Sequence, residues 1–242
     1  MGVLEYFDRG YVINLPRRRD RRAETEAMFD RRGLTNWRDR VEFFPAIAPE
    51  SAAGYASIGA RGGLLSHAAV LRAALDRGAR NVLVMEDDLE IDPAFVARGD
   101  EIVGLLESLD WSFVYFGHNL RSLWTATEGP LLRPRVGHVI LAHLYAVNGR
   151  ILPRLVEFME SVDSRPVGDP DGGPMYADGA LDFFRVRNPD ALTLVAAPCL
   201  GWQRPSASDI TSKWYDKAPV LGGMAAAARK LKRAVRGRRV PE

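Results

Sequence analysis

The sequence predicts an α/β fold in which helices flank a mostly parallel central sheet. Short runs of apolar and β-branched residues alternate along the chain with longer segments of helical periodicity. The short runs are almost wholly apolar, which is typical of strands that are buried on both faces of a sheet. The chain has 242 residues, of which 47% are hydrophobic, so it is long enough to bury a sizeable core.

The first predicted unit is a strand followed by a charged helix. Residues Tyr11–Leu15 form a short apolar run, which Pro16 ends. A surface helix is predicted over Arg18–Arg32, and Gly33 would end it in the left-handed conformation. The few apolar positions that could form its buried edge are Ala23, Ala27 and Met28.

The second predicted unit leads to an acidic turn. We expect a helix over Leu64–Arg77, with Ser66 as its N-cap and Gly78 at its end. The apolar run Asn81–Met85 then predicts a strand that is buried on both faces. This strand stops at three consecutive carboxylates, which are Glu86, Asp87 and Asp88.

The rest of the chain predicts a similar alternation. The expected strands are Ser112–Phe116, Val139–Val147 and Leu192–Leu200, and the expected helices are Ile151–Val162 and Asp178–Val186. Residues 163–173 are rich in Pro, Gly and Asp and predict a loop, whereas residues 202–216 are irregular, polar and aromatic. The composition changes near residue 221, so we expect one domain over residues 1–220 and a basic C-terminal tail over residues 221–242.

Charge is distributed unevenly along the chain. Residues 225–242 carry seven of the 33 basic side chains and one of the 31 acidic ones. This leaves 26 basic and 30 acidic side chains, a net charge of −4, for residues 1–224. A nucleic-acid-binding domain usually carries a basic stripe on its folded surface, so we expect no nucleic-acid partner.

Cysteine content and hydropathy indicate the compartment. The single cysteine, Cys199, excludes an intrachain disulfide and a thiolate metal cluster. No apolar stretch approaches the roughly 20 residues of a membrane helix. We expect no signal peptide, because the N-terminal residues lack an apolar core. The expected location is therefore cytoplasmic.

The three carboxylates after a buried strand are the clearest functional feature. Ligands of open α/β sheets bind at the carboxyl ends of strands. Carboxylate oxygens suit Mn²⁺ or Mg²⁺, and Mg²⁺ is usually held by one or two carboxylates together with substrate phosphates. Side chains alternate along a strand, so Glu86 and Asp88 should point to one side and Asp87 to the other. One side would hold a metal while the other contacts a ribose; the alternative is a solvated turn that only ends the strand.

Five segments resemble glycosyltransferase family 25, the group of lipopolysaccharide-type and procollagen galactosyltransferases. They are Ile13–Leu15 with the basic run 17–22, Gly63–His67, Val82–Asp88, Phe113–Gly117 and Gln203–Ile210. Together they span residues 11–210, and their order and spacing are specific. The resemblance implies a GT-A-like nucleotide-sugar fold and an inverting hexosyltransferase that uses a nucleotide diphosphate sugar.

Several polar residues are candidates for binding that donor. Asn14 could form a hydrogen bond with the base or ribose. The alternative is that Asn14 only stabilises the turn at Pro16. Arg21 could neutralise a diphosphate, and the alternative is a solvated helix face. His118 follows a strand end, a favourable place for substrate contact, with a simple loop histidine as the alternative. The predicted nucleotide-sugar-binding residues are Asn14, Leu15, Arg21, Glu86, Asp87 and His118, and the predicted ligands of Mn²⁺ or Mg²⁺ are Glu86 and Asp88.

An inverting transfer also needs a base that takes the proton of the acceptor hydroxyl. Asp178 lies in a segment that resembles the second acidic site of the family, and it is the predicted base; helix capping is the alternative. Asp182 is a second candidate, and His67 belongs to the Ser-His segment of the resemblance. Residues that could complete the site or stack on a sugar are Gln203, Ser208, Asp209, Trp202, Trp214 and Tyr215.

The acceptor would be a glycan or a lipid-linked saccharide, as in lipopolysaccharide biosynthesis. The basic residues within 225–239 could hold the enzyme peripherally on the anionic inner face of a membrane, and a solubilising tail is the alternative. Two other functions stay open. A nucleotidyltransferase that makes a nucleotide sugar also needs carboxylates, but no Gly-rich, Lys-containing phosphate loop follows the first strand. A non-catalytic nucleotide-sugar-binding or scaffold protein would not need the intact acidic turn.

Overall fold

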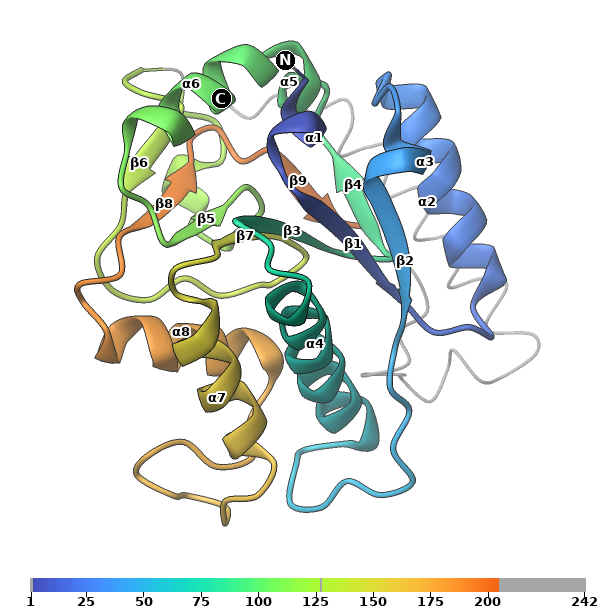
Figure 1. Ribbon diagram of the computed structural model, residues 1–242, viewed down its shortest axis with the longest axis vertical. Helices are drawn as coiled ribbons and strands as arrows, with labels where there is room; N and C mark the ends of the chain where they lie inside the picture. Colours follow the sequence, from blue (N-terminus) through green and yellow to red (C-terminus); the bar gives the residue numbers. More distant parts are fainter. Residues whose placement is uncertain (1, 127, 205–242) are drawn as a thin grey trace.

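The computed structural model describes residues 2–126 and 128–204 (Figure 1). Its strands are β1 Arg9–Asn14, β2 Val41–Pro45, β3 Asn81–Glu86, β4 Leu89–Ile91, β5 Phe113–Tyr115, β6 Leu132–Pro134, β7 Leu144–Asn148, β8 Thr193–Ala196 and β9 Gly201–Gln203. Its helices are α1 Val3–Tyr6, α2 Arg19–Arg32, α3 Trp37–Arg40, α4 Ile58–Asp76, α5 Pro93–Ala97, α6 Gly99–Ser108, α7 Leu152–Val162 and α8 Ala177–Arg187, with a 3₁₀ turn η1 at Arg121–Leu123.

Within these residues, seven strands form one sheet in the order β2-β1-β3-β7-β5-β8-β6, and β4 pairs with β9 in a separate ribbon. β1, β2, β3, β5 and β8 run in one direction, whereas β7 and β6 run in the other. The sheet is therefore mixed but mostly parallel. This topology, with its flanking helices, confirms the predicted α/β class and is consistent with a GT-A-like fold.

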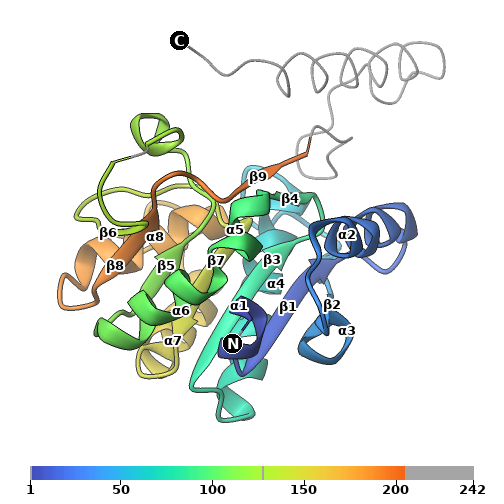
Figure 2. The same cartoon turned by 90° about the horizontal axis from the view of Figure 1, so that it is seen from above.

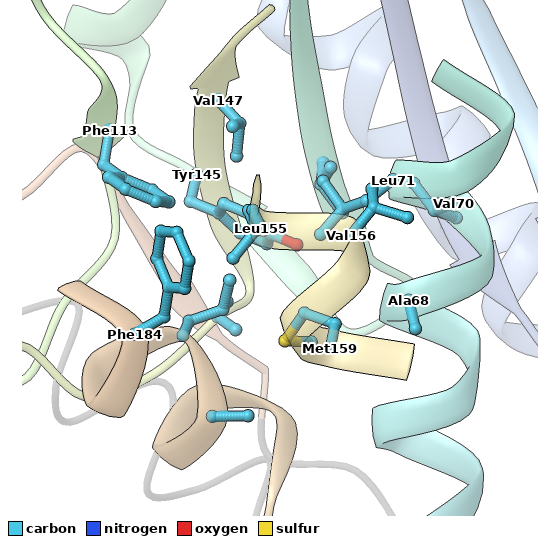
Figure 3. Close-up of a cluster of buried hydrophobic side chains, with 14 of the residues drawn as sticks. Ala68, Val70, Leu71, Phe113, Tyr145, Val147, Leu155, Val156, Met159 and Phe184 are labelled. Atoms are coloured by element: carbon cyan, nitrogen blue, oxygen red, sulfur yellow. The ribbon is translucent and has the colours of Figure 1, made fainter. Parts of the chain in front are cut away.

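Helices cover both faces of the sheet (Figures 1 and 2). α4, α7 and α8 pack on one face, where the buried side chains include Leu71, Tyr145, Val156 and Phe184 (Figure 3). α1, α2, α5 and α6 contribute to a second core on the other face. Because both faces are covered, the strands are apolar on both sides, as the sequence predicted.

The carboxyl ends of the parallel strands meet at one edge of the sheet. In the pairing of β1 with β3, Ile13 lies opposite Glu86, so Asn14 and the acidic turn emerge side by side. β5 and β8 also pair in parallel, with Tyr115 opposite Val195. We call this side of the sheet the carboxyl edge; it is formed by the residues that follow β1, β3, β5 and β8.

The charged helix α2 buries a different side from the one that the sequence predicted. Gly33 ends it at φ 69° in the left-handed conformation, as expected. Ala23 and Ala27 are both exposed, however, so their assignment to the buried edge is wrong, whereas that of Met28 is right. The buried positions are Arg21, Thr25, Met28 and Phe29. Their spacing places them on one helical face. The two polar residues of this face, Arg21 and Thr25, contact the acidic turn.

The N-terminus of α4 lies earlier than predicted. Ser57 is the N-cap, and its hydroxyl accepts a hydrogen bond from the amide of Ala60 at 3.0 Å. Ser66 lies within the helix, where its hydroxyl donates to Gly62 O at 2.6 Å and accepts from the amide of Ile47 at 2.8 Å. The assignment of Ser66 as the cap is therefore wrong. Within the helix, Gly62 serves close packing, because a Cβ there would lie 2.7 Å from Ile47 O.

Two predicted strands are shorter than expected. The segment 139–143 precedes β7 rather than belonging to it, because side chains take up its amides: Val139 N bonds Asp182 and Leu141 N bonds Asp178. The run Leu192–Leu200 is interrupted after β8, since Pro198 has no amide hydrogen for a ladder. Trp202, which we expected in an irregular region, lies in β9. The loop over residues 163–173 and helices α7 and α8 are confirmed to within two residues at each end.

Some predictions fall outside the described residues. They are the domain boundary near residue 221, the basic tail 225–239, and Ser208, Asp209, Trp214 and Tyr215. Within the described part of the chain, no helix combines the length and the apolar composition needed to cross a membrane.

Candidate functional site

Asp87 is the centre of a buried hydrogen-bond cluster at the carboxyl edge. Its Oδ1 accepts from Arg21 Nη1 at 2.7 Å, and its Oδ2 accepts from Asn14 Nδ2 at 2.7 Å. Its carbonyl oxygen accepts from the hydroxyl of Thr25 at 2.9 Å. These donors come from β1 and α2, so Asp87 fixes the acidic turn to both elements.

Arg204 holds the same turn from the other side. It follows β9 and is only 6% exposed. Its Nη2 donates to Asp87 O at 2.6 Å and to Thr25 Oγ1 at 3.2 Å, and its backbone amide donates to Asp88 O at 2.6 Å. The backbone of the acidic turn is thus bound by donors from α2 and from the end of β9.

Glu86 points toward α4, on the opposite side from Asp87. Its Oε1 lies 3.4 Å from His67 Nε2, and its Oε2 accepts from Gln203 Nε2 at 2.9 Å. His67 Nδ1 lies 2.9 Å from the hydroxyl of Tyr145. A carboxylate can only accept, so Nε2 of His67 carries a hydrogen toward Glu86. Burial would raise the pKa of Glu86, but the interactions with His67, His143 and Gln203 together hold the pKa below its ordinary value.

Asp88 has the least stabilised carboxylate of the turn. Its Oδ1 is buried and has no hydrogen-bond partner among the described residues, and its Oδ2 lies 3.8 Å from Arg21 Nη1. Burial, with the nearby charge of Glu86, raises the pKa of Asp88 to about 7. The expected alternation holds for Glu86 and Asp87. Asp88 lies in the turn after the strand, close to both Arg21 and Glu86, so it does not follow the strand alternation.

The oxygen atoms at this edge fit a hard divalent cation that also binds phosphate. Across residues 2–126 and 128–204, no three His, Cys, Asp or Glu side chains are arranged to hold a metal ion by themselves. The described carboxylates that could contribute oxygen ligands to such an ion are Asp88, whose buried Oδ1 has no donor among these residues, and the nearby Glu86. One or two carboxylates completed by substrate phosphates is the usual coordination of Mg²⁺.

His118 has a structural position. It is fully buried, its Nε2 donates to Ala196 O at 2.7 Å, and its Nδ1 accepts from the amide of Leu120 at 3.2 Å. Burial lowers the pKa of His118, which favours the neutral ring. Both ring nitrogens are used by the backbone, so we leave His118 out of the proposed donor site. Leu15 is half-buried, and its carbonyl accepts from the amide of Arg18 at 2.8 Å.

Asp178 and Asp182 hold the segment before β7. Asp178, at the start of α8, is half-buried and accepts from the amide of Leu141 at 3.2 Å. Asp182 is buried, accepts from the amide of Val139 at 2.8 Å and lies 2.5 Å from His138 Nδ1. Asp182 is thus an anchor for this segment. The two oxygens of Asp178 accept from the amides of Leu141 and Gly179, the latter at 2.8 Å.

Curated proteins of known family resemble this chain, although no family model matches it. A "Glycosyltransferase 25 family member" of Drosophila pseudoobscura pseudoobscura is 25% identical over 189 residues, which cover 62% of this chain and 29% of that protein. A protein of the same description from Aedes aegypti is 30% identical over 129 residues, 44% of this chain and 20% of that protein. The similarity supports a glycosyltransferase of the family 25 type. It confirms the resemblance seen in the motifs, while the chain spans less than a third of the length of these relatives.

Two solved structures have similar folds at low identity. One is a glycosyltransferase involved in the glycosylation of the major capsid of PBCV-1, with a TM-score of 0.47 and 10% identity over 92% of this chain and 98% of that one. The other is described as mannose-1-phosphate geranyltransferase from Thermus thermophilus, with a TM-score of 0.42 and 12% identity over 80% of this chain and 75% of that one. At these TM-scores, neither structure bears on the activity of this chain.

The site predicted from the sequence omitted Thr25, Arg204 and Tyr145. Thr25 lies four residues after Arg21, so helical spacing was the available signal for it. Arg204 lies inside the segment 203–210 that carried part of the family resemblance. Tyr145 is an aromatic residue in an apolar strand, and nothing in its sequence context distinguishes it from a core residue.

Proposed function

We propose that this chain transfers a sugar from a nucleotide diphosphate sugar, bound at the carboxyl edge, to a saccharide acceptor. The supporting observation is the carboxylate of Asp88 at the end of β3, which has a buried oxygen without a donor among the described residues. Such a group needs positive charge from a ligand, because burial without a partner is costly for a carboxylate. The similarity to family 25 glycosyltransferases supports the same function.

Asp88, with Glu86, would hold Mn²⁺ or Mg²⁺. When bound, this ion supplies positive charge that stabilises the leaving nucleoside diphosphate. The surrounding residues keep the two carboxylates in place: Arg204 and Thr25 bind the backbone of the turn, and Gln203 binds Glu86. The proposed ion site is thus assembled from the ends of β3 and β9.

Asn14, Leu15 and Arg21 border the expected position of the nucleotide. Arg21 is buried and lies 2.7 Å from Asp87 Oδ1 and 3.8 Å from Asp88 Oδ2. Its charge therefore balances the aspartates, and the same charge would attract a diphosphate bound beside Asp88. We propose that Asn14 and Leu15 contact the base or ribose through the backbone and side chains at the end of β1.

Asp178 is the proposed base. In the transfer, the acceptor oxygen forms a bond to the anomeric carbon while the bond from that carbon to the diphosphate oxygen breaks. The acceptor proton passes to Asp178, and the nucleoside diphosphate leaves with the bonding electrons. Attack opposite the leaving group inverts the anomeric centre. The hydrogen bond from Leu141 N to Asp178 fixes the orientation of this carboxylate.

A panel of nucleotide sugars tests the function. The wild-type chain with Mn²⁺ or Mg²⁺ is incubated with each donor, and release of nucleoside diphosphate is measured with and without saccharides. We expect release from at least one donor, and loss of that release in Asp88→Asn. A matched control is Asp190→Asn, since Asp190 is exposed and pairs at the surface with Arg154. The proposal fails if wild type releases nucleoside diphosphate from no donor, or if Asp88→Asn is as active as wild type.

The cellular setting is proposed from charge alone. Seven basic residues within 225–239 would add on the order of 1 kcal/mol each near an anionic surface. We propose peripheral, salt-sensitive binding at the cytoplasmic face of a membrane, which suits a glycan or lipid-linked saccharide acceptor. Sedimentation with anionic liposomes, compared between the full chain and a chain that ends at Gly223, tests this proposal. Equal binding of the two chains, or no binding at low salt, would refute it.

A further inference from the structure

Trp124 is an exposed tryptophan at the carboxyl edge that the proposed donor site does not use. It directly follows η1 and is 41% exposed. Leu120 and Leu123 of the same loop pack against the core on the α4 face. The loop is therefore anchored by its leucines, while the Trp124 side chain stays partly exposed to solvent.

Hydrogen bonds fix the orientation of the indole. Trp124 Nε1 donates to His118 O at 2.8 Å, and Trp124 O accepts from the amide of Cys199 at 3.4 Å. One edge of the ring is thus bound to its own loop, and the backbone is bound to the segment that leads to β9. A ring held in this way loses little conformational freedom when a ligand stacks on it.

His118 and Gly117 shape the loop that carries Trp124. The imidazole of His118 is fully buried and bonds Ala196 O and the amide of Leu120. At Gly117, a Cβ would lie 2.2 Å from His143 Nε2, so only glycine fits at this position. His118, which the sequence favours for substrate contact, therefore serves together with Gly117 to present the tryptophan.

Two routes connect Trp124 to the acidic turn. The first runs through His143, which lies against Gly117 and whose carbonyl accepts from the amide of Glu86 at 3.1 Å. The second runs from Cys199 along the chain to Gln203, which bonds Glu86 at 2.9 Å. In Figure 2 the green loop that follows β5 lies on the same side of the molecule as β4 and β9. The loop that carries Trp124 is thus linked to Glu86 from the β5 and β8 side, whereas Arg21 reaches the acidic turn from α2.

We propose that Trp124 is the stacking surface for a sugar ring of the saccharide acceptor. This inference rests on the proposed function. The face of an indole carries negative charge density and is apolar, so it suits the hydrogen-bearing face of a pyranose while the sugar hydroxyls stay solvated. The neighbours Arg121, Ser122 and Thr125 are polar. A single ring within polar surroundings fits one sugar unit and gives too little apolar area for an acyl chain or a protein surface.

The test compares Trp124→Ala and Trp124→Phe with wild type. The probes are the methyl glycosides of galactose, glucose and N-acetylglucosamine, used as acceptors with the nucleotide sugar that wild type hydrolyses. We expect Trp124→Ala to raise the acceptor KM about tenfold, equivalent to about 1.4 kcal/mol, and Trp124→Phe to keep most of the affinity. Transfer of the sugar to water, measured without acceptor, should stay within about twofold. Val186→Ala, which truncates an exposed residue near the end of α8, is the control.

Direct binding gives a second readout that needs no turnover. Saturation-transfer NMR with the same methyl glycosides should show contact with wild type and Val186→Ala, and none with Trp124→Ala. The inference is wrong if Trp124→Ala keeps the wild-type acceptor KM and saturation transfer, or if wild type shows no contact with any of these glycosides. Failure of the proposed function is a separate result, because wild type would then release nucleoside diphosphate from no donor, with or without saccharides.

Discussion

Arg21 and Asp87 form a buried ion pair, with Arg21 Nη1 2.7 Å from Asp87 Oδ1. The pair joins α2 to the end of β3 across 66 positions of sequence. Asn14 and Thr25 bond the same aspartate residue, so its side-chain oxygens and its carbonyl are all occupied. The three acids of the turn thus differ in their contacts: Asp87 holds the turn, Glu86 binds α4 and β9, and Asp88 has a buried oxygen without a donor among the described residues.

Removal of one partner of this pair should destabilise the fold strongly. Arg21→Met leaves the buried Asp87 carboxylate without its guanidinium, and we expect a loss of about 3–5 kcal/mol in the free energy of unfolding. Urea unfolding measures it. Arg22→Met is the matched control, because Arg22 is half-exposed and pairs with Glu26, so its loss should be below about 1 kcal/mol. Equal losses in the two variants would show that the buried pair does not hold the turn.

Two glycines should respond in opposite ways to alanine. Gly117→Ala would place a Cβ 2.2 Å from His143 Nε2 and 2.9 Å from Gly201 O, so we expect a destabilisation of several kcal/mol, at the upper end of single-residue effects. Gly104→Ala, in α6, meets no atom within 4 Å and should stabilise by up to about 1 kcal/mol. Thermal unfolding measures both. A Gly117→Ala protein as stable as wild type would contradict the packing of the Trp124 loop against His143.

The buried His118 should make stability depend on pH. Burial lowers its pKa in the folded protein, so the unfolded chain takes up the proton first as pH falls. The contribution of His118 to stability is therefore present above the ordinary pKa of about 6.5 and is lost as pH falls toward the folded pKa. In His118→Gln the unfolding free energy should fall less between pH 7.5 and 5.5 than in wild type. Burial also lowers the pKa of His143, so some pH dependence of stability remains in both proteins. Identical pH slopes would contradict a neutral, buried His118.

Much of the fold was predictable because hydropathy reports burial directly. Residues Val82–Met85 are all apolar, and the run Asn81–Met85 forms β3 with the acidic turn at its end, as predicted. β4 and β9 escaped prediction because each has three residues and their pairing depends on contacts far apart in sequence. The start of α4 was misplaced because Ser66 resembles an N-cap, while the actual cap is Ser57.

The candidate site was only partly predictable, for a different reason. Glu86 and Asp88 follow from their position at a strand end. The burial of Arg21 does not, because an arginine in a charged helix is ordinarily solvated and its partner Asp87 is distant in sequence. His118 had a favourable sequence position, yet its ring nitrogens are taken by backbone groups that local sequence does not reveal.

Binding of a nucleoside diphosphate tests the central claim most directly. Titration calorimetry with uridine and guanosine diphosphates, each with and without Mn²⁺, compares wild type with Asp88→Asn and Asp190→Asn. We expect wild type and Asp190→Asn to bind one of the diphosphates in the presence of Mn²⁺, with at least about tenfold weaker binding without the ion and in Asp88→Asn. Binding that is unchanged by Asp88→Asn, or absent from wild type under all conditions, would contradict a metal-assisted nucleotide-sugar site at Asp88.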